Sequence, residues 1–153
     1  MKELLARIAQ MPRFVEEAVQ AAGPAGLSVR GEGEIFSIRE QACHLRDLER
    51  EGWLVRARRI LAEDVPDLAG FDGAAVAAGR DYPAQDAKAV ASDFAAARAE
   101  LVAIFSRATP AELAREATIF GRRITLSDLV AMIDEHDRGH RAEIDSLRVA
   151  EAR

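Results

Sequence analysis

Apolar residues recur at every third or fourth position over most of this 153-residue chain, and this spacing constrains its fold more than any other feature. The clearest run follows a heptad pattern without a break: Ala87, Val90, Phe94, Ala97, Leu101, Ile104 and Ala108. Such a pattern gives a helix one apolar face that must be buried. Three other stretches have a similar stripe. The sequence therefore predicts an all-α fold in which four amphipathic helices pack as an antiparallel bundle.

The ends of the helices follow from local signals. The first helix spans residues 3–21, and Pro12 should kink or divide it because proline has no amide hydrogen for the Ile8 carbonyl. A capping box of Ser37 and Glu40 opens the second helix, which we expect to reach about residue 62. Its predicted buried stripe is Ile38, Gln41, Leu45, Leu48, Gly52 and Val55.

Two other segments interrupt the helical pattern. Residues 63–85 are rich in glycine and proline and form a connection that is long for a bundle, as functional or mobile loops often are. A short helix should begin at Pro110, and residues 118–125 predict a small hairpin or extended turn. Thr125 then caps the fourth helix, with Asp128 at the third helical position.

Composition narrows the class of protein. Length and an apolar content of 49% predict a single domain over residues 1–153. The net charge of −5 argues against a nucleic-acid partner, and the chain has no apolar run of the length that a membrane span needs. Cys43 is the only cysteine, and the first residues do not resemble a signal peptide. We therefore expect a cytoplasmic protein.

The fourth helix carries two histidines in the middle of its apolar stripe. The stripe comprises Leu126, Leu129, Ile133, His136, His140, Ile144 and Leu147. His136 and His140 are one turn apart on the same face, and burying them is costly unless each imidazole gains a partner. His44, the third histidine, flanks the stripe of the second helix. The three could hold one divalent cation with open positions. The alternative is a metal-free bundle with ordinary hydrogen-bonded core histidines.

Two carboxylates could assist such a site. Glu143 shares the face of the histidine pair, where it could orient a ligand, act as a general base or complete the metal coordination. It could equally be a solvated glutamate. Asp47 could orient His44, or it could be an ordinary carboxylate paired with a nearby arginine. Asp137 follows His136 where a zincin peptidase would have glutamate, which argues against that class.

Three further positions have simpler interpretations. Cys43 points away from His44 on the helix and has no base to activate it, so we do not expect a nucleophilic thiol. Trp53 falls off the predicted stripe and could cover the first helix or a subunit contact. Arg122 and Arg123 are expected in a solvated turn, and nothing else in the sequence supports an anion-binding role for them.

The segments 36–47 and 130–140 resemble the DinB/YfiT-like superfamily. That family has an aromatic-Ser pair before its second helix, a His-Leu-x-Asp segment and a His-x-x-x-His pair on its fourth helix. Residues 62–68 and 124–129 are also similar to family members, and the resemblance extends over about residues 3–148. It implies an up-down-down-up four-helix bundle, a homodimer, and Zn, Ni or Fe bound by His44, His136 and His140. Family members often have glutamine where this chain has Glu143.

The resemblance also bears on activity, because characterised relatives include transferases and isomerases that use bacillithiol or mycothiol, and others are named metal-dependent hydrolases. Our leading hypothesis is a metal-dependent enzyme with a small-molecule substrate. It would activate either water, with Glu143 as base, or a low-molecular-weight thiol in a groove walled by residues 63–85. The competing hypothesis is a non-catalytic, stress-related module for metal binding or dimerisation.

Overall fold

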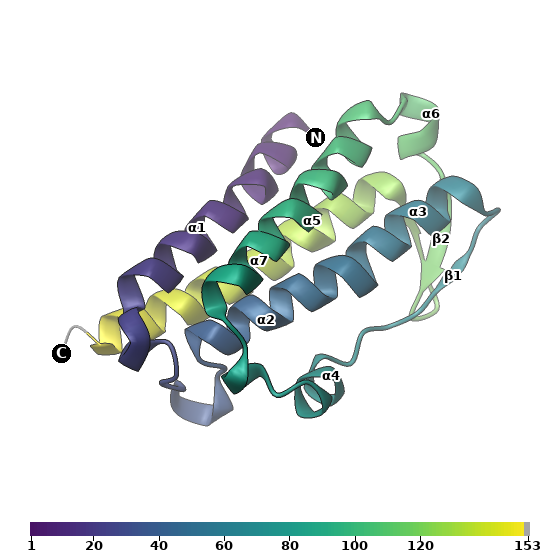
Figure 1. Cartoon of the computed structure of the whole chain (residues 1–153). Helices are drawn as coiled ribbons and strands as arrows, with labels where there is room; N and C mark the ends of the chain where they lie inside the picture. The colour runs from purple at the N-terminus through teal and green to yellow at the C-terminus, as the bar shows by residue number, and fades with distance from the viewer. Residues whose placement is uncertain (152–153) are drawn as a thin grey trace.

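Long helices packed side by side dominate the structure, a computed structural model that describes residues 1–151 (Figure 1). These helices are α1 (Lys2–Gly26), α2 (Ile38–Leu48) with its continuation through the π-helical turn η2 (Glu49–Trp53) into α3 (Leu54–Ala62), α5 (Ala87–Arg107) and α7 (Leu126–Glu151). The prediction of a predominantly helical fold is confirmed. In the described residues, no helix combines the length and the apolar character that a membrane crossing requires.

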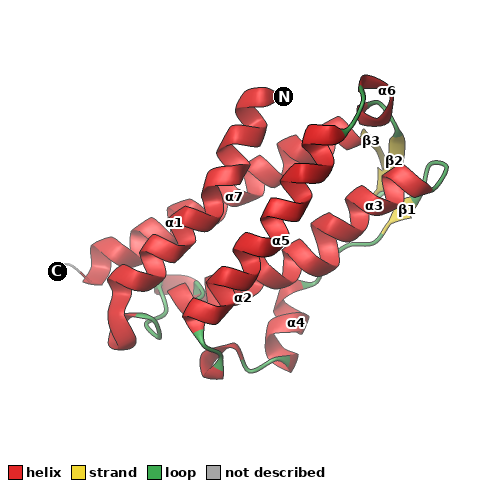
Figure 2. Ribbon diagram, turned by 45° about the horizontal axis from the view of Figure 1, so that its top comes forward, coloured by secondary structure: helices red, strands yellow, loops and turns green. Residues whose placement is uncertain are grey.

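Most of the short elements lie at the ends of the long helices, whereas α4 lies beside α2 (Figure 2). They are η1 (Glu32–Glu34), β1 (Asp67–Leu68), α4 (Gly73–Gly79), η3 (Tyr82–Ala84), α6 (Pro110–Leu113), β2 (Glu116–Ile119) and β3 (Arg122–Thr125). The antiparallel pair β2–β3 is the hairpin that the sequence predicts. The sequence did not predict that β1 would pair in parallel with β2, which anchors the long connection to the hairpin.

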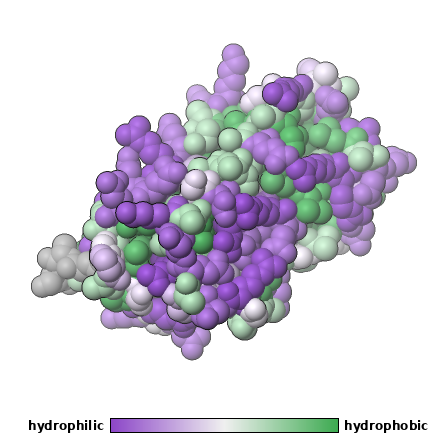
Figure 3. All heavy atoms as spheres, viewed as in Figure 1, coloured by the Kyte–Doolittle hydropathy of each residue, from purple (hydrophilic) through white to green (hydrophobic). Residues whose placement is uncertain are grey.

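The core consists of two apolar clusters, one toward each end of the bundle. Ile8, Leu101 and Ile133 belong to the cluster at the hairpin end, and Phe94 and Ile144 belong to the other. Polar side chains cover most of the face seen in Figure 3. His136 and His140 lie on α7 between Ile133 and Ile144, so the predicted site falls where the two clusters meet.

Pro12 does not divide the first helix. The chain stays helical through Pro12, and the break comes instead at Gly23, whose φ of 66° and ψ of 176° are not helical. Proline still removes one backbone donor, because residue 12 has no amide hydrogen for the Ile8 carbonyl. Arg98 of α5 replaces that donor: its Nη1 donates to the Ile8 oxygen at 2.8 Å.

Arg98 links all four long helical stretches of the described chain. Its guanidinium also donates to both oxygens of Glu49 in η2, at 2.6 and 2.9 Å, and to both oxygens of Asp137 in α7, at 2.6 and 3.1 Å. Only 1% of Arg98 is exposed, and burial raises the pKa of both carboxyl groups while the guanidinium opposes that rise. One buried cation therefore fixes the mutual position of α1, η2, α5 and α7.

The π-helical turn η2 explains why part of the predicted stripe is wrong. A π turn contains one more residue than an α turn, so it rotates every later side chain about the helix axis. Val55, predicted to be buried, is 41% exposed, whereas Leu54 and Ala57 are buried in its place. The same rotation turns Trp53 inward, where it is only 6% exposed.

Replacing Arg98 with methionine should strongly destabilise the fold. The variant leaves the carboxylates of Glu49 and Asp137 buried without a partner, and such a loss costs about 3–5 kcal/mol in the free energy of unfolding. Urea unfolding of Arg98→Met measures this cost. Arg58→Met, which removes an exposed partner of Glu100, is the matched control and should have little effect. Equal effects of the two substitutions would contradict the role of Arg98.

Candidate metal centre

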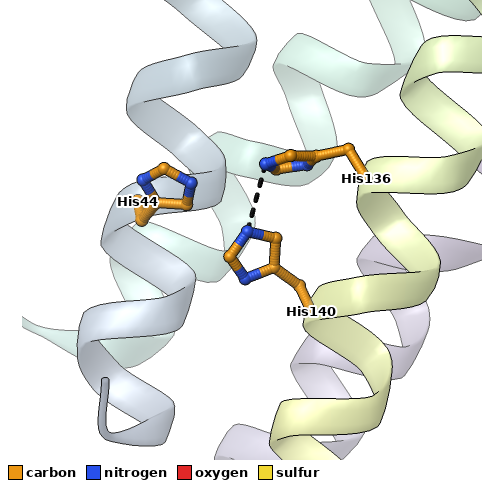
Figure 4. Close-up of side chains that lie close together, drawn as sticks. All are labelled: His44, His136 and His140. Atoms are coloured by element: carbon orange, nitrogen blue, oxygen red, sulfur yellow. Dashed lines mark hydrogen bonds between the residues drawn. The ribbon is translucent and has the colours of Figure 1, made fainter. Parts of the chain in front are cut away.

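The structure brings the three histidines together from two helices. His44 extends from α2, and His136 and His140 extend from successive turns of α7 toward the same point (Figure 4). The ring centroid of His140 lies 4.8 Å from that of His44 and 4.4 Å from that of His136. One nitrogen from each ring lies within 4.8 Å of the others. The arrangement unites all three predicted ligands.

The chemistry of this cluster fits a divalent cation. The Nε2 atoms of His136 and His140 are 3.1 Å apart, close to the spacing of about 3.4 Å between nitrogens that share one zinc ion. Burial is the largest cause that lowers the pKa of His44 to about 4, of His136 to about 3 and of His140 to about 4, and the neighbouring imidazoles contribute to the first two shifts. All three rings are therefore neutral near pH 7 and carry the lone pairs that a metal requires.

Gln41 fixes the ring of His140. The Gln41 Nε2 donates to Glu143 Oε2 at 2.6 Å, so its Oε1 is the atom that faces His140 Nδ1, at 2.5 Å. An amide oxygen only accepts hydrogen bonds, which places the proton of the neutral ring on Nδ1 and leaves the lone pair on Nε2. Gln41 thus directs the lone pair of His140 into the cluster. The sequence placed Gln41 on the buried stripe without assigning it this role.

Glu143 lies behind His140 and not among the three facing nitrogens. Its Oε2 accepts the bond from Gln41 and lies 3.4 Å from His140 Nδ1. This contact matches one of the alternatives considered for Glu143, the orientation of a ligand histidine. The same carboxylate also lines a cavity of about 300 Å³ that reaches His44 and His140. Glu143 therefore lies next to both the His140 ring and this cavity.

Asp47 serves the surrounding structure and does not contact His44. It is 3% exposed and accepts hydrogen bonds from Tyr82 Oη at 2.7 Å and from Arg46 Nε at 2.8 Å, and Arg80 pairs with it at 3.1 Å. Although burial alone would raise it, these bonds hold the pKa of Asp47 below its usual value. Of the two alternatives for Asp47, the structure favours pairing with arginine, and it adds an anchor for η3.

The side chains of Cys43 and Trp53 point in different directions relative to the site. The Cys43 sulfur faces the Tyr82 carbonyl at 4.0 Å, away from the histidines, and burial raises the pKa of its thiol to about 11. Trp53, in contrast, meets the His136 ring edge-on with a centroid distance of 5.8 Å. Phe36 and Phe71 flank His44 at 6.2 and 6.1 Å. These aromatic rings limit water around the imidazoles.

Glycine at position 73 lets α4 approach His44 closely. A Cβ atom at Gly73 would lie 2.7 Å from His44 Cε1 and 2.9 Å from its Nδ1. The Nδ1 atoms of His44 and His136 are buried without a hydrogen-bond partner in the described structure. The first residues of α4 also line the 300 Å³ cavity. The connection between α3 and α5 therefore forms one wall of the site. It can contact His44 this closely because residue 73 is a glycine and has no side chain.

Comparison with known proteins identifies a family and a similar fold. The sequence model of the DinB superfamily matches residues 5–144. Among proteins of curated function, none matches the sequence. YfiT from Bacillus subtilis, described as "a probable metal-dependent hydrolase with an unusual four-helix bundle topology", shares the fold with a TM-score of 0.90 and 18% sequence identity. The alignment covers 99% of this chain and 87% of YfiT.

Filling the space at Gly73 should weaken metal binding. In Gly73→Ala the new methyl group must displace either the His44 ring or α4, and we expect affinity for Zn²⁺ to fall on the order of tenfold to a hundredfold. Isothermal titration calorimetry measures the change. Gly79→Ala, in the same short helix but with open space around it, should retain wild-type affinity. Identical affinities for both variants would show that His44 does not depend on this approach.

The metal-free protein should lose stability as the pH falls below about 6.5. The unfolded histidines take up protons near that pH, whereas the folded cluster resists protonation until about pH 4, so acid favours the unfolded state within this window. Urea unfolding in EDTA at pH 7, 6 and 5 tests this. The variant His136→Leu should show a shallower loss over the same range. An equally steep loss would mean that these rings do not cause it.

Proposed function

This chain belongs to the DinB superfamily, and on that premise we propose that it is a metal-dependent enzyme acting on a small-molecule substrate. The observation that carries the proposal is the convergence of His44, His136 and His140, three neutral imidazoles with ligand nitrogens within 4.8 Å of one another. His44 is on α2, and His136 and His140 are on α7. When bound, a divalent cation such as Zn²⁺, Ni²⁺ or Fe²⁺ supplies Lewis-acid chemistry that activates water or a thiol near pH 7.

The residues around the cluster have separate tasks in this proposal. Gln41 and Glu143 hold His140 in the tautomer that presents Nε2. Trp53 shields His136, and Phe36 shields His44, which lowers the local dielectric and strengthens charge interactions at the site. The substrate and the nucleophile approach through the cavities that reach the histidines.

Hydrolysis is the first of two reaction classes that the site would support. Glu143 lines the 300 Å³ cavity with His44 and His140, and a carboxylate there can take a proton from attacking water. The description of YfiT as a probable metal-dependent hydrolase agrees with this class. We therefore place Glu143 in the reaction as general base, in addition to its contact with Gln41.

Transfer to a low-molecular-weight thiol of the bacillithiol or mycothiol type is the second class. The connection between α3 and α5 walls the 300 Å³ cavity through Gly73 and Ala74, which is the groove that a polar thiol would need. From the family we also propose the up-down-down-up order of the helices and a homodimer, and from the length and composition a single domain over residues 1–153 and a cytoplasmic location. A metal-binding or dimerisation module without turnover is the alternative function.

Metal analysis and one conservative variant test the proposed enzyme. The purified protein should bind one Zn²⁺, Ni²⁺ or Fe²⁺ per chain, and His136→Ala should lose both the metal and the activity against a panel of esters, amides and thiol acceptors. Glu143→Gln keeps an acceptor for Gln41 but cannot take a proton. It should keep the metal and lower the kcat of hydrolysis at least about a hundredfold, and it should leave thiol transfer nearly unchanged.

Three outcomes would count against parts of this proposal. Failure to bind any of the three metals stoichiometrically would exclude the metal site. Turnover that persists in His136→Ala would exclude a reaction that depends on a metal held by the three histidines. Stoichiometric metal without turnover on the whole panel would favour the module.

A further inference from the structure

A second cavity, of about 670 Å³, extends along α7 from the β2–β3 hairpin to His136. Asp128, Ala131, Glu135 and His136 line it from successive turns of the helix. From Asp128 to His136 an α-helix rises about 12 Å, so the cavity is elongated and one end lies at the candidate metal centre. Its volume falls in the range of small-molecule sites, and it shares no lining residue with the smaller cavity beside His44.

One part of the cavity wall is apolar and buried. Trp53, Ile119 and Ile124 line it and are 6%, 3% and 8% exposed. Phe120 stands at the hairpin turn with its side chain 77% exposed and a positive φ of 51°, a conformation that a bulky residue seldom adopts. An aromatic ring is thus held in solvent at the edge of an apolar groove. A ligand with an apolar body would cover these surfaces.

Positive charge without a carboxylate partner gathers around the hairpin end and Trp53. Arg122 lines the cavity, and within the described residues no acidic side chain lies within 4 Å of its guanidinium, whereas Arg123 pairs with Glu116 at 3.0 Å. Arg56, which is 6% exposed, stacks at 4.7 Å on Trp53 and, within the described residues, donates only to the Ala69 carbonyl, but it does not line the cavity. Arg122 is therefore the lining arginine that is available to pair with an anionic group.

Two carboxylates, Asp128 and Glu135, also line the cavity, but neither pairs with Arg122 in the part of the chain that the structure describes. The Asp128 carboxylate accepts hydrogen bonds from the Thr125 amide and hydroxyl, within the capping box that starts α7. Glu135 lies next to His136, at the opposite end from Arg122. The cavity therefore has an arginine without a carboxylate partner at the hairpin end and an acidic group near the candidate metal centre, where a cation would offset it. A bound anion would be oriented by this polarity.

We infer that the cavity binds a small amphipathic anion, with an apolar body against Trp53, Ile119 and Ile124 and a carboxylate or similar group at Arg122. The far end of the molecule then reaches His136. This step rests on the proposed function: the substrate of the enzyme is then an elongated compound whose anionic group is remote from the bond that reacts. Binding itself requires only the cavity and its charges, and not the metal.

The single tryptophan of the chain makes this inference directly measurable. Trp53 lines the cavity, so its fluorescence should change when a ligand enters. Titrations in EDTA compare 4-phenylbutanoate, 4-phenylbutanol and 4-phenylbutylamine, which share one apolar body and differ in charge. EDTA removes any metal that could itself bind the carboxylate. We expect the carboxylate to bind about tenfold or more tightly than the alcohol and the amine to bind most weakly.

Variants locate the binding. Arg122→Ala should weaken 4-phenylbutanoate about tenfold without affecting the alcohol, and Ala131→Phe, at an exposed position that lines the cavity, should block all three probes. Arg13→Ala, an exposed arginine of α1 outside the cavity, is the matched control and should change nothing. Equal binding of the three probes would overturn the anionic preference. Binding that persists in Ala131→Phe would overturn the location.

These results separate the inference from the proposed function. If the protein binds one metal ion per chain but its fluorescence responds to none of the probes, the cavity is not a ligand site and the proposed metal-dependent enzyme is unaffected. A charge-selective response in a protein that binds no metal would establish the ligand site and remove the metal-dependent reaction.

Discussion

The buried guanidinium of Arg98 is the interaction on which the arrangement of the bundle depends. Hydrophobic packing alone allows helices to slide and rotate with little cost, whereas five directional hydrogen bonds to Ile8, Glu49 and Asp137 specify one arrangement. Asp137 follows His136 directly, so the same contacts that register α7 against α5 also set the rotation of the histidine pair. The buried ion cluster thereby helps to position the candidate metal centre.

The π-helical turn after Glu49 has a comparable influence on the opposite wall. It allows α2 to present His44 on one face while α3 buries Leu54 and Ala57, which a continuous α-helix could not do with this sequence. Trp53 reaches His136 because of that extra residue. Glu49, at the start of the turn, is held by Arg98. The π-helical turn and the buried ion cluster are thus directly connected, and together they position the helices that carry the three imidazoles.

Local patterns predicted the helices, and distant contacts decided the features that were missed. Periodicity, the Ser37 capping box and the hairpin signal depend on neighbours within a few residues, so the sequence indicated them correctly. The spacing of His136 and His140 likewise placed two rings on one face. Arg98 could not be foreseen, since an arginine within a helix is normally exposed and its partners lie 39 to 90 residues away. Gln41 and the β1–β2 pairing share this dependence on residues far along the chain.

The connection between α3 and α5 is fixed at both ends and packs against the bundle between them. At its start β1 pairs with β2, and at its end Tyr82 donates a hydrogen bond to Asp47. Between these points α4 lies beside His44, and its Val76 and Ala77 pack against an apolar cluster of the bundle. Insertions or substitutions in that span can change which molecules reach the imidazoles while the two fixed ends and the long helices keep their positions. New substrate specificities can therefore arise in this fold through changes in one connection whose two ends stay fixed.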